Sequence, residues 1–584
     1  MKRCPQCNRV ESDEALKFCR ADGTTLVEDS SSFNSEAGTA QLASSPYASE
    51  VHTSILPHTT VANANRATGP TTVLPPQPAG TTNELTKPKR RRAAIIIAVV
   101  ATAIMAGVTA IVVDFYRSRN SAKSIQSIAV LPFENKSTDA DTDYLSDGLA
   151  DSLIFRLSQL PGMKVSPSTS VMRYKGKETD IAKVASELGV EAIMTGRLLK
   201  RGDNLNITVE LIDVRNNKSL WGEQYERKMS DLLSTQREIA FIIAQKLQLK
   251  LSGNEKALTK HYTDNNEAYE LYLKGRYYWN KRDEENLRKA IEQFKGAADK
   301  DPNFARSFVG LADCYAVLPF YSMTLSDEGM TQAKAYAERA IEIDDSLGEA
   351  HTSLGYANLC LWNWAEAEKE LKRGIELNPN YATAHKFYAN YLSDMGRFDE
   401  ALAEFRRAQE LEPLSLIISA NVAEVYLTKE DPYAAFEQCQ RAIELDPTWA
   451  YVRQLSAIAY LKQGKNAEAL AEAEKSVELS KRHSNPLATL GYIYAQTGRR
   501  SEAMAIIEEL KAKQMKHEAY GLQLARVYLG LGDKEQAFAW LEKDFQAHSS
   551  TLPSWMFIPP LNSLREDSRF KDLVRRMGIP ESKP

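Results

Sequence analysis

Three cysteines and one aspartate near the start of the chain have the residue types and the spacing of a metal site. Cys4 and Cys7 form a CxxC pair, and after eleven further residues Cys19 and Asp22 repeat the same interval. Zinc binds cysteine sulfur and carboxylate oxygen, and structural zinc sites usually have four such ligands. Gly23 would allow a tight turn after the second pair. These residues therefore predict a zinc site made by Cys4, Cys7, Cys19 and Asp22.

The length of this head, residues 1–28, also favours a metal, because so short a segment cannot bury an apolar core unaided. The alternative is a tail with three incidental thiols, although a chance cluster is unexpected in a chain with six cysteines in all. The fourth ligand is open, since a water molecule or a residue of a second copy could replace Asp22. Cys314, Cys360 and Cys439 lie far apart and are expected to be small apolar residues between helices.

No other stretch of the sequence has the spacing of a known catalytic motif. None of the eight histidines falls in an HExxH pattern, and the chain contains no GxxxxGK[ST] loop, no GxSxG and no kinase set. We therefore predict that the protein is not an enzyme, with an active site in the α/β segment described below as the alternative. The net charge of −4 and the pI near 6.2 give no basic field, so no nucleic-acid partner is expected.

An apolar run separates the head from the rest of the chain. Residues 29–92 are rich in Ser, Thr, Ala and Pro, end in KPKRRR, and predict a disordered linker with a basic end. Residues 93–113 are 21 residues without a charge. At a rise of 1.5 Å per residue, such a helix spans a hydrocarbon core of about 30 Å. We therefore predict one transmembrane helix there, because the run lies too far along the chain for a signal peptide.

Small residues in this run would allow a homodimer. They recur every four residues, which lets two membrane helices approach closely. Alanine is equally common in membrane helices that do not associate, so a monomer remains the alternative. The residues concerned are Ala94, Ala98, Thr102, Ala106 and Ala110.

Residues 124–252 alternate strand and helix signals and predict one α/β domain. The runs SIAVLPF and MKVSP are short and apolar, as in buried strands, and residues 143–160 have apolar residues at helical spacing. Gly189 ends a second short helix that begins at Asp180. Gly202-Asp203 between two strand-like runs predicts a hairpin, which is followed by the strand SLWGEQY and an amphipathic helix over residues 231–251.

From Ala268 onward the sequence repeats itself. Pro379, Pro413 and Pro447 are 34 residues apart, which is the tetratricopeptide period. Small and aromatic residues recur at matching places in each unit, where two helices must pack. We predict an array over residues 266–549 with seven repeats and an eighth at Glu518, followed by a capping segment over residues 550–584 with a polar end. The seven start near Ala268, Asn303, Gly348, Ala382, Leu416, Ala450 and Ser484.

Three segments resemble known families. The head, with FCRADGT at its second pair, resembles zinc-ribbon heads at the start of many bacterial membrane proteins. Residues 128–251 resemble the TolB amino-terminal-like or FlgO-like domain, through IAVLPFEN, YLSDGLADSLI, SVMRYKGKETDIAKVASELGVEAIMTGRLLKRGDNLNITVELIDV and LWGEQYER. The repeats resemble tetratricopeptide (TPR) arrays. In related architectures a cytoplasmic kinase, cyclase or winged-helix head precedes one membrane helix and the same two following domains. The resemblance also implies a bacterial source.

The TPR resemblance also implies which residues face a partner. The first helix of each repeat lines the concave face of such arrays, and mixed aromatic and polar residues there suit peptide capture. A solvated face without a ligand is the alternative. The predicted groove residues are Tyr356, Lys386, Asn390, Glu424, Tyr451, Gln454, Tyr492 and Arg526.

The charges that flank the apolar run predict its orientation. Five basic residues precede it and three follow it, which favours a cytoplasmic N-terminal side. A zinc ribbon also keeps its thiolates best in the reducing cytosol. We therefore place the protein in the bacterial inner membrane as a single-pass protein with residues 114–584 in the periplasm. The basic residues are Lys87, Lys89, Arg90, Arg91 and Arg92 before the run, and Arg117, Arg119 and Lys123 after it.

Together these features predict a multidomain chain: a small zinc ribbon, one transmembrane helix, an α/β domain and an all-α TPR superhelix. The function that this order favours is a membrane-anchored scaffold that binds a protein or peptide in the TPR groove. The alternative is a transmembrane signal transducer whose cytoplasmic zinc ribbon contacts a regulatory partner.

Overall fold

The computed structural model describes residues 2–3, 10–11, 27–28, 125–137, 142–160, 162–177, 180–247, 258–321 and 327–580. The chain divides into two compact units, Met1–Val100 and Ala101–Pro584. In the first unit, β1 (Lys2–Arg3) pairs antiparallel with β2 (Val10–Glu11) and β3 (Val27–Glu28). The four predicted zinc ligands, the predicted linker and the predicted membrane run at 93–113 lie outside the described residues. Among those described, no helix is both long and apolar enough to cross a membrane.

The second unit begins with a mixed sheet of six described strands, in the order β6-β4-β7-β8-β9 with β5 also paired to β7. Its parallel part joins β4 to β6 and to β7, and its antiparallel part is the hairpin β7–β8 extended by β9. Gly202 turns the hairpin with φ +59°, in the left-handed region that glycine tolerates. The predicted strands and hairpin are therefore confirmed. The strands are β4 (Ser127–Val130), β5 (Glu134–Asn135), β6 (Lys164–Val165), β7 (Ala192–Arg201), β8 (Asn204–Asp213) and β9 (Lys218–Lys228).

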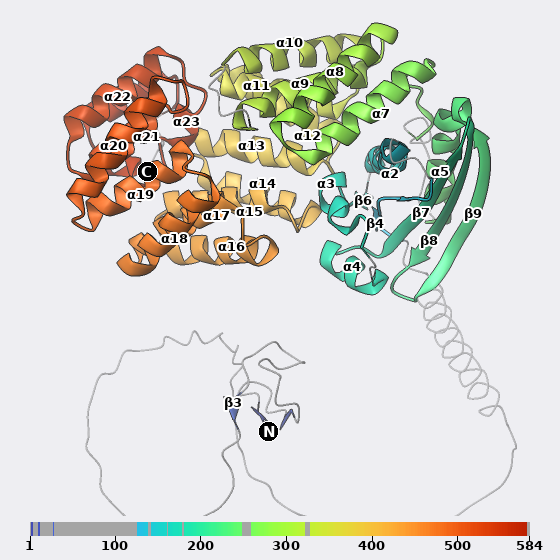
Figure 1. Cartoon of the computed structure of the whole chain (residues 1–584), viewed down its shortest axis with the longest axis horizontal. Helices are drawn as coiled ribbons and strands as arrows, with labels where there is room; N and C mark the ends of the chain where they lie inside the picture. The colour runs from blue at the N-terminus through green and yellow to red at the C-terminus, as the bar shows by residue number, and fades with distance from the viewer. Residues whose placement is uncertain are drawn as a thin grey trace, which may run out of the picture. The chain divides into compact units, whose positions relative to one another are not determined.

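Two long helices of this domain pack against each other and against the sheet (Figure 1). They are α2 (Asp143–Ser158) and α5 (Leu232–Lys246), both close to their predicted places. The shorter α4 (Ile181–Leu188) begins at Asp180, whose carboxylate accepts the amide of Ala182, and ends at Gly189 in the left-handed conformation. The remaining turns are α3 (Ser168–Val171), η2 (Met172–Tyr174) and η3 (Met229–Asp231).

The repeat region folds as predicted, with eight helical hairpins among the described residues between 266 and 546. Each hairpin begins within three residues of its predicted start, because the 34-residue pattern is a local property of each pair. The pairs are α7 (Asn266–Lys281) and α8 (Glu284–Lys300); α9 (Ala305–Tyr321) and α10 (Asp327–Ile343); α11 (Gly348–Cys360) and α12 (Trp364–Leu377); α13 (Ala382–Asp394) and α14 (Phe398–Leu411); α15 (Leu416–Thr428) and α16 (Pro432–Leu445); α17 (Ala450–Lys462) and α18 (Asn466–Leu479); α19 (Ser484–Gln496) and α20 (Arg500–Gln514); and α21 (Gly521–Gly530) and α22 (Lys534–Gln546).

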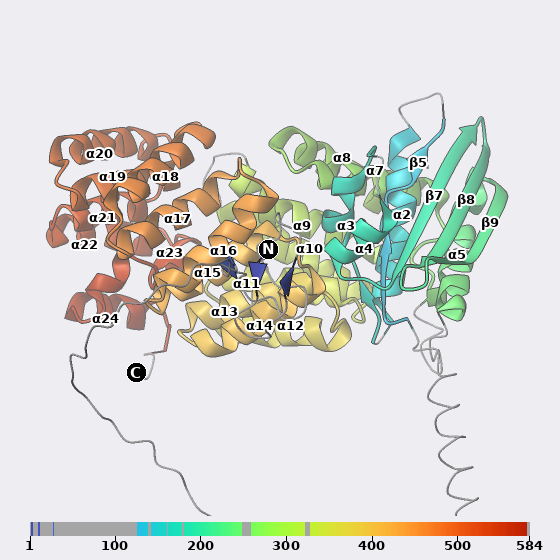
Figure 2. The same cartoon turned by 90° about the horizontal axis from the view of Figure 1, so that it is seen from below.

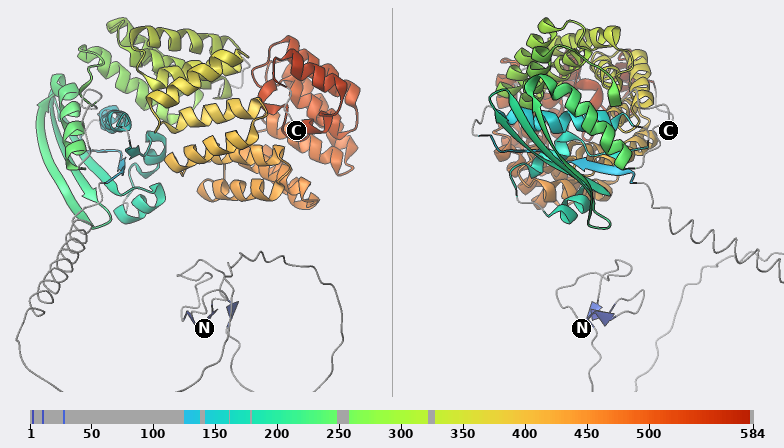
Figure 3. Two further views of the ribbon diagram at one scale, coloured as in Figure 1. Left: turned by 180° about the vertical axis from the view of Figure 1, so that it is seen from behind. Right: turned by 90° about the vertical axis from the view of Figure 1, so that its right-hand side faces the viewer.

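The α/β domain and the first repeat share one apolar core, so they form a continuous body (Figure 3). Nearly all of α2 is buried, because it packs on the sheet and also against α7. Gly148 makes this approach close: a Cβ at that position would lie 2.8 Å from Leu273 Cδ2. The Tyr144 hydroxyl donates to Glu270 across the same interface at 2.7 Å. The domain therefore has a set position at one end of the array.

The predicted capping segment differs from the expectation of a simple polar cap. Its last helix, α24 (Ser568–Arg576), has basic residues in its final turn as predicted. The preceding α23 (Leu552–Trp555) and η4 (Leu561–Leu564) are instead buried in the core of the later repeats. The indole of Trp364, on α12, donates to the Met577 carbonyl at 2.8 Å. The chain end thus returns from the eighth repeat to the third.

Candidate functional site

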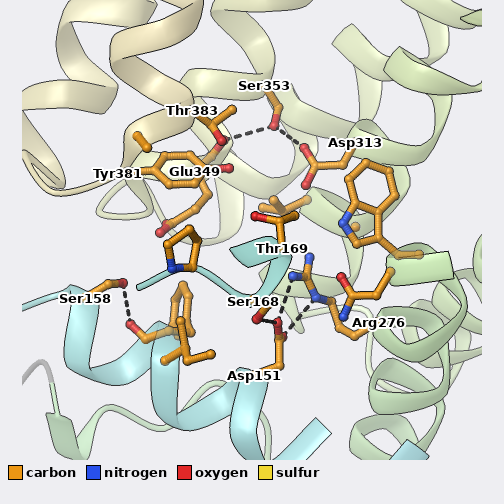
Figure 4. Close-up of a pocket in the computed structure, with 18 of the residues that line it drawn as sticks. Asp151, Ser158, Ser168, Thr169, Arg276, Asp313, Glu349, Ser353, Tyr381 and Thr383 are labelled. Carbon is orange, nitrogen blue, oxygen red and sulfur yellow. Dashed lines mark hydrogen bonds and ion pairs between the residues drawn. The ribbon is translucent and has the colours of Figure 1, made fainter. Parts of the chain in front are cut away.

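A cavity of about 230 Å³ lies between the α/β domain and the first helices of the first four repeats (Figure 4). From the α/β side it is lined by α2 and by the turn that carries Ser168 and Thr169. From the repeat side it is lined by Arg276 on α7, Asp313 on α9 and residues of α11 and α13. The site is thus enclosed by two parts of the chain that sequence reasoning treated separately.

A bidentate ion pair closes one wall of the cavity. Arg276 donates from Nε and Nη2 to the two carboxylate oxygens of Asp151, each at 3.0 Å. The Ser168 hydroxyl donates to the same carboxylate at 2.5 Å. Burial would raise the pKa of Asp151, but the Arg276 charge and these hydrogen bonds hold it below its ordinary value. The pair therefore stays ionised and ties α2 to α7 at the cavity wall.

Two further acidic residues line the repeat side. Asp313 accepts from the Ser353 hydroxyl at 2.6 Å, and burial raises its pKa. Glu349 Oε1 accepts from the side-chain amides of Gln159 and Asn378, both at 3.1 Å. Its other oxygen, Oε2, is buried and has no hydrogen-bond partner in the described part of the chain. A bound group that carries an N–H donor would satisfy it.

Lys386 presents an amine to the cavity without an ion pair. Its Nζ lies 4.1 Å from the centre of the Phe387 ring, and the acids Glu412 and Asp313 act on it through their charge without an ion pair among the described residues. The carboxylate of Glu412 accepts instead from Thr169 at 2.5 Å and from Ser170 at 3.3 Å. Burial lowers the pKa of Lys386 to about 8, against the opposing charge of Glu412. An anion that entered the cavity would pair with this amine and raise its pKa again.

The predicted groove residues divide between two places. Tyr356 and Lys386 line the cavity, and the Tyr356 ring stacks on Phe387 with 3.9 Å between centroids. Asn390 is half-buried on α13, one turn beyond Lys386. Their contact with a partner stays a prediction.

The other five predicted groove residues lie in the second half of the array, and their contact with a partner also stays a prediction. Glu424, Tyr451 and Tyr492 are half-buried, while Gln454 is 0 % and Arg526 is 1 % exposed. Two of them lie beside α23, since the Trp555 ring is 6.4 Å from the Tyr451 ring and 4.9 Å from the Arg526 guanidinium.

Sequence reasoning missed Asp151, Arg276, Asp313 and Glu349. A signal for Asp151 was present, since the aspartates at 143, 147 and 151 recur every four residues on an otherwise apolar helix. Such a stripe indicates a charged partner on the neighbouring element. For metals, the described residues contain no group of three His, Cys, Asp or Glu side chains that could hold an ion. The predicted zinc ligands lie outside the described residues.

Comparisons with known proteins agree with this architecture. Residues 123–242 match the family described as "HilA/YgeH-like transcriptional regulator, second domain", and three tetratricopeptide-repeat families match residues 388–448, 460–523 and 519–543. The fold and these matches define a tetratricopeptide-repeat protein with a preceding α/β domain. The resemblance of that domain to TolB-like and FlgO-like domains stays a prediction, because the matching family carries the HilA/YgeH description.

The curated relatives include one named as an adenylate cyclase and one named as a transcriptional regulator. The chain is 31% identical over 245 residues to "Putative adenylate cyclase 3" of Rhizobium meliloti, covering 41% of this chain and 42% of that one. It is 23% identical over 309 residues to "Transcriptional regulator HilA" of Salmonella typhimurium, covering 52% and 53%. The chain therefore spans about half the length of the curated relatives it matches.

Solved structures are similar in the repeat fold alone. One is YrrB, described as a TPR protein with an unusual peptide-binding site: 17% identity, TM-score 0.26, covering 34% of this chain and 97% of that one. Another is pilF of Pseudomonas aeruginosa: 21% identity, TM-score 0.29, covering 39% and 97%.

Proposed function

We propose that this protein is a membrane-anchored scaffold that binds a protein or peptide in the cavity between the α/β domain and the first four repeats. The observation that carries the proposal is the Lys386 amine, which lines the cavity without an ion pair. A carboxylate of the partner would pair with it, and a charge-assisted hydrogen bond of this kind contributes about 1.5–3 kcal/mol. The unpaired Oε2 of Glu349 would accept an N–H of the same segment.

The test is capture of partners by the full chain from solubilised membranes, with mass spectrometry to identify them. We expect Lys386→Met to reduce capture of specific partners at least about tenfold, because it removes the charge and keeps the side-chain length. The matched control is Lys369→Met on α12, whose side chain is 77% exposed and pairs with Glu370. Equal capture by both variants and the wild type would refute the cavity as the binding site.

The anchor and its orientation are part of the same proposal. They are supported by the uncharged run at residues 93–113 and by the excess of basic residues before it. In this arrangement the cavity faces the periplasm and the zinc head faces the cytoplasm. Alkaline phosphatase fused after Ser124 and after Pro584 is expected to be active at both points. If alkaline phosphatase were inactive at both fusion points, and green fluorescent protein fused at the same points were fluorescent, the repeats would lie in the cytosol.

A second candidate function is a transmembrane signal transducer whose zinc head contacts a regulatory partner. The names of the curated relatives favour it, since a protein named as an adenylate cyclase and one named as a transcriptional regulator are similar to 41% and 52% of this chain. Deletion of residues 1–28 separates the two functions. A scaffold keeps its partners after the deletion, whereas a transducer loses a cytoplasmic partner that depends on the head.

A further inference from the structure

The segment that follows the last repeat packs among the later repeats, where its helix α23 contacts α13 and α22 (Figure 2). We call residues 549–564 the C-terminal segment. Its Trp555 ring lies 6.4 Å from the Tyr451 ring on α17, and the Arg526 guanidinium on α21 lies 4.9 Å from Trp555. The Ser554 hydroxyl donates to Asp394, at the end of α13, at 3.3 Å. All three contacts are with first helices of repeats, so the segment occupies the surface that a peptide partner uses in such arrays.

Two polar side chains on the first helices of the sixth and eighth repeats are buried without a full set of hydrogen bonds. Gln454 is fully buried, and neither its amide oxygen nor its amide nitrogen has a hydrogen-bond partner in the described part of the chain. Arg526 donates from Nη2 to Thr489 at 2.5 Å, but its Nε and Nη1 are unpaired. Buried polar groups are normally hydrogen-bonded, and a buried cation is normally paired. The contact of the Arg526 guanidinium with the Trp555 ring compensates only part of the hydration that the guanidinium loses on burial.

Neighbouring acids do not neutralise Arg526. Glu424, on the same face, accepts from the Tyr451 hydroxyl and from Asn421 Nδ2, the latter at 2.9 Å. Asp394 accepts from Ser554 in the C-terminal segment. Among the described residues no carboxylate lies within ion-pair distance of the Arg526 guanidinium. The face is therefore built for an anion that the C-terminal segment does not supply.

The chemistry of the absent group follows from the two side chains. The planar fork of a guanidinium binds a carboxylate through two parallel hydrogen bonds. The Gln454 amide can donate and accept, as an extended backbone requires. The apolar side chains Leu552, Met556 and Leu561 of the C-terminal segment are fully buried in the core of the later repeats. The best occupant thus combines apolar anchors with one acidic residue.

We propose that the C-terminal segment is a built-in competitor on a second binding site, and that a partner segment with apolar anchors around a carboxylate displaces it and pairs with Arg526. This site is independent of the cavity at Lys386, because the two share no residue. The segment therefore sets a threshold for binding: a partner must replace the apolar contacts and add the ion pair.

The test uses the full chain and labelled peptides with the sequence of residues 549–564. One peptide carries W555E, which places a carboxylate beside Arg526 in place of the indole. The matched control peptide carries W555Q. We expect the W555E peptide to bind the Trp555→Ala chain at least about tenfold more tightly than it binds the wild-type chain. It should also bind that variant about tenfold more tightly than the W555Q peptide, and Arg526→Met should remove this difference. Equal affinity of the two peptides, or of the two chains, would overturn the proposal.

A measurement on the wild-type chain tests the same proposal without a variant that could misfold. Saturating W555E peptide should accelerate amide hydrogen exchange in residues 552–564, because the C-terminal segment is released, while α21 keeps its protection. Unchanged exchange in residues 552–564 at saturation would show that the segment is not displaced. Lys386→Met should leave both readouts unchanged, which separates this site from the cavity.

Discussion

The ion pair between Asp151 and Arg276 offers the sharpest test of how the α/β domain is fixed to the repeats. Their side chains are 6% and 21% exposed, and the pair is bidentate with both distances at 3.0 Å. Removing one partner of a buried pair costs about 3–5 kcal/mol, because the other charge is left without compensation. Since Arg276 is partly exposed, we expect the lower end, about 3 kcal/mol, for Arg276→Met.

Native-state hydrogen exchange measures this loss locally. A loss of about 3 kcal/mol corresponds to roughly a hundredfold rise in the opening equilibrium. We expect amides of α2 and α7 to exchange faster by about that factor, while those of α19 stay unchanged as an internal reference. The double variant Asp151→Leu with Arg276→Met should return close to the wild type, because an apolar pair replaces the buried charges.

The same variant has a defined pH dependence. In the wild type the pKa of Asp151 is held low, so the contribution of the pair is present above the ordinary value of about 3.9 and is lost as the pH falls below it. Without Arg276, burial would raise the pKa of Asp151, so protonation of this carboxylate would relieve the variant as the pH falls. The loss of stability of Arg276→Met relative to the wild type should therefore be larger at pH 7 than at pH 5. Unaltered protection of α2 and α7 at pH 7, or a double variant as unstable as the single one, would refute this account.

Three further predictions concern other parts of the chain. Gly148→Leu should cost about 1–3 kcal/mol and accelerate exchange in α2 and α7, with partial rescue by Leu273→Ala, because a Cβ at 148 meets Leu273 at 2.8 Å. Asp394→Asn should raise the thermal midpoint of unfolding more at pH 8 than at pH 5. Burial raises the pKa of Asp394 to about 8, so the wild type loses stability as the pH rises from about 4 to 8. A smaller difference between variant and wild type at pH 8 would contradict this prediction. A reduced peptide of residues 1–28 should bind one zinc with a change in circular dichroism; Cys4→Ser should abolish binding and Asp22→Ala should only weaken it, and a peptide that ignores zinc would contradict the site.

Much of the fold could be predicted from the sequence because its signals are local. The 34-residue interval between Pro379, Pro413 and Pro447 placed the helical hairpins, since each repeat packs mainly on its neighbours. The strand and helix order of the α/β domain followed from apolar periodicity and from glycine turns such as Gly202. The candidate site could be predicted only in part: Tyr356 and Lys386 follow from repeat positions, whereas Asp151 comes from another domain.

The sequence by itself determined which residues form repeats, and it predicted which residues of each repeat meet a partner on the concave face. Only the tertiary structure decided what occupies that face. The α/β domain closes its first half, because Gly148 lets α2 approach α7 and Arg276 pairs with Asp151. The C-terminal segment closes its second half and buries Arg526. Such contacts join residues more than a hundred positions apart or lie between separate elements, and their free energy depends on burial and approach distance, which no local pattern of residue types encodes.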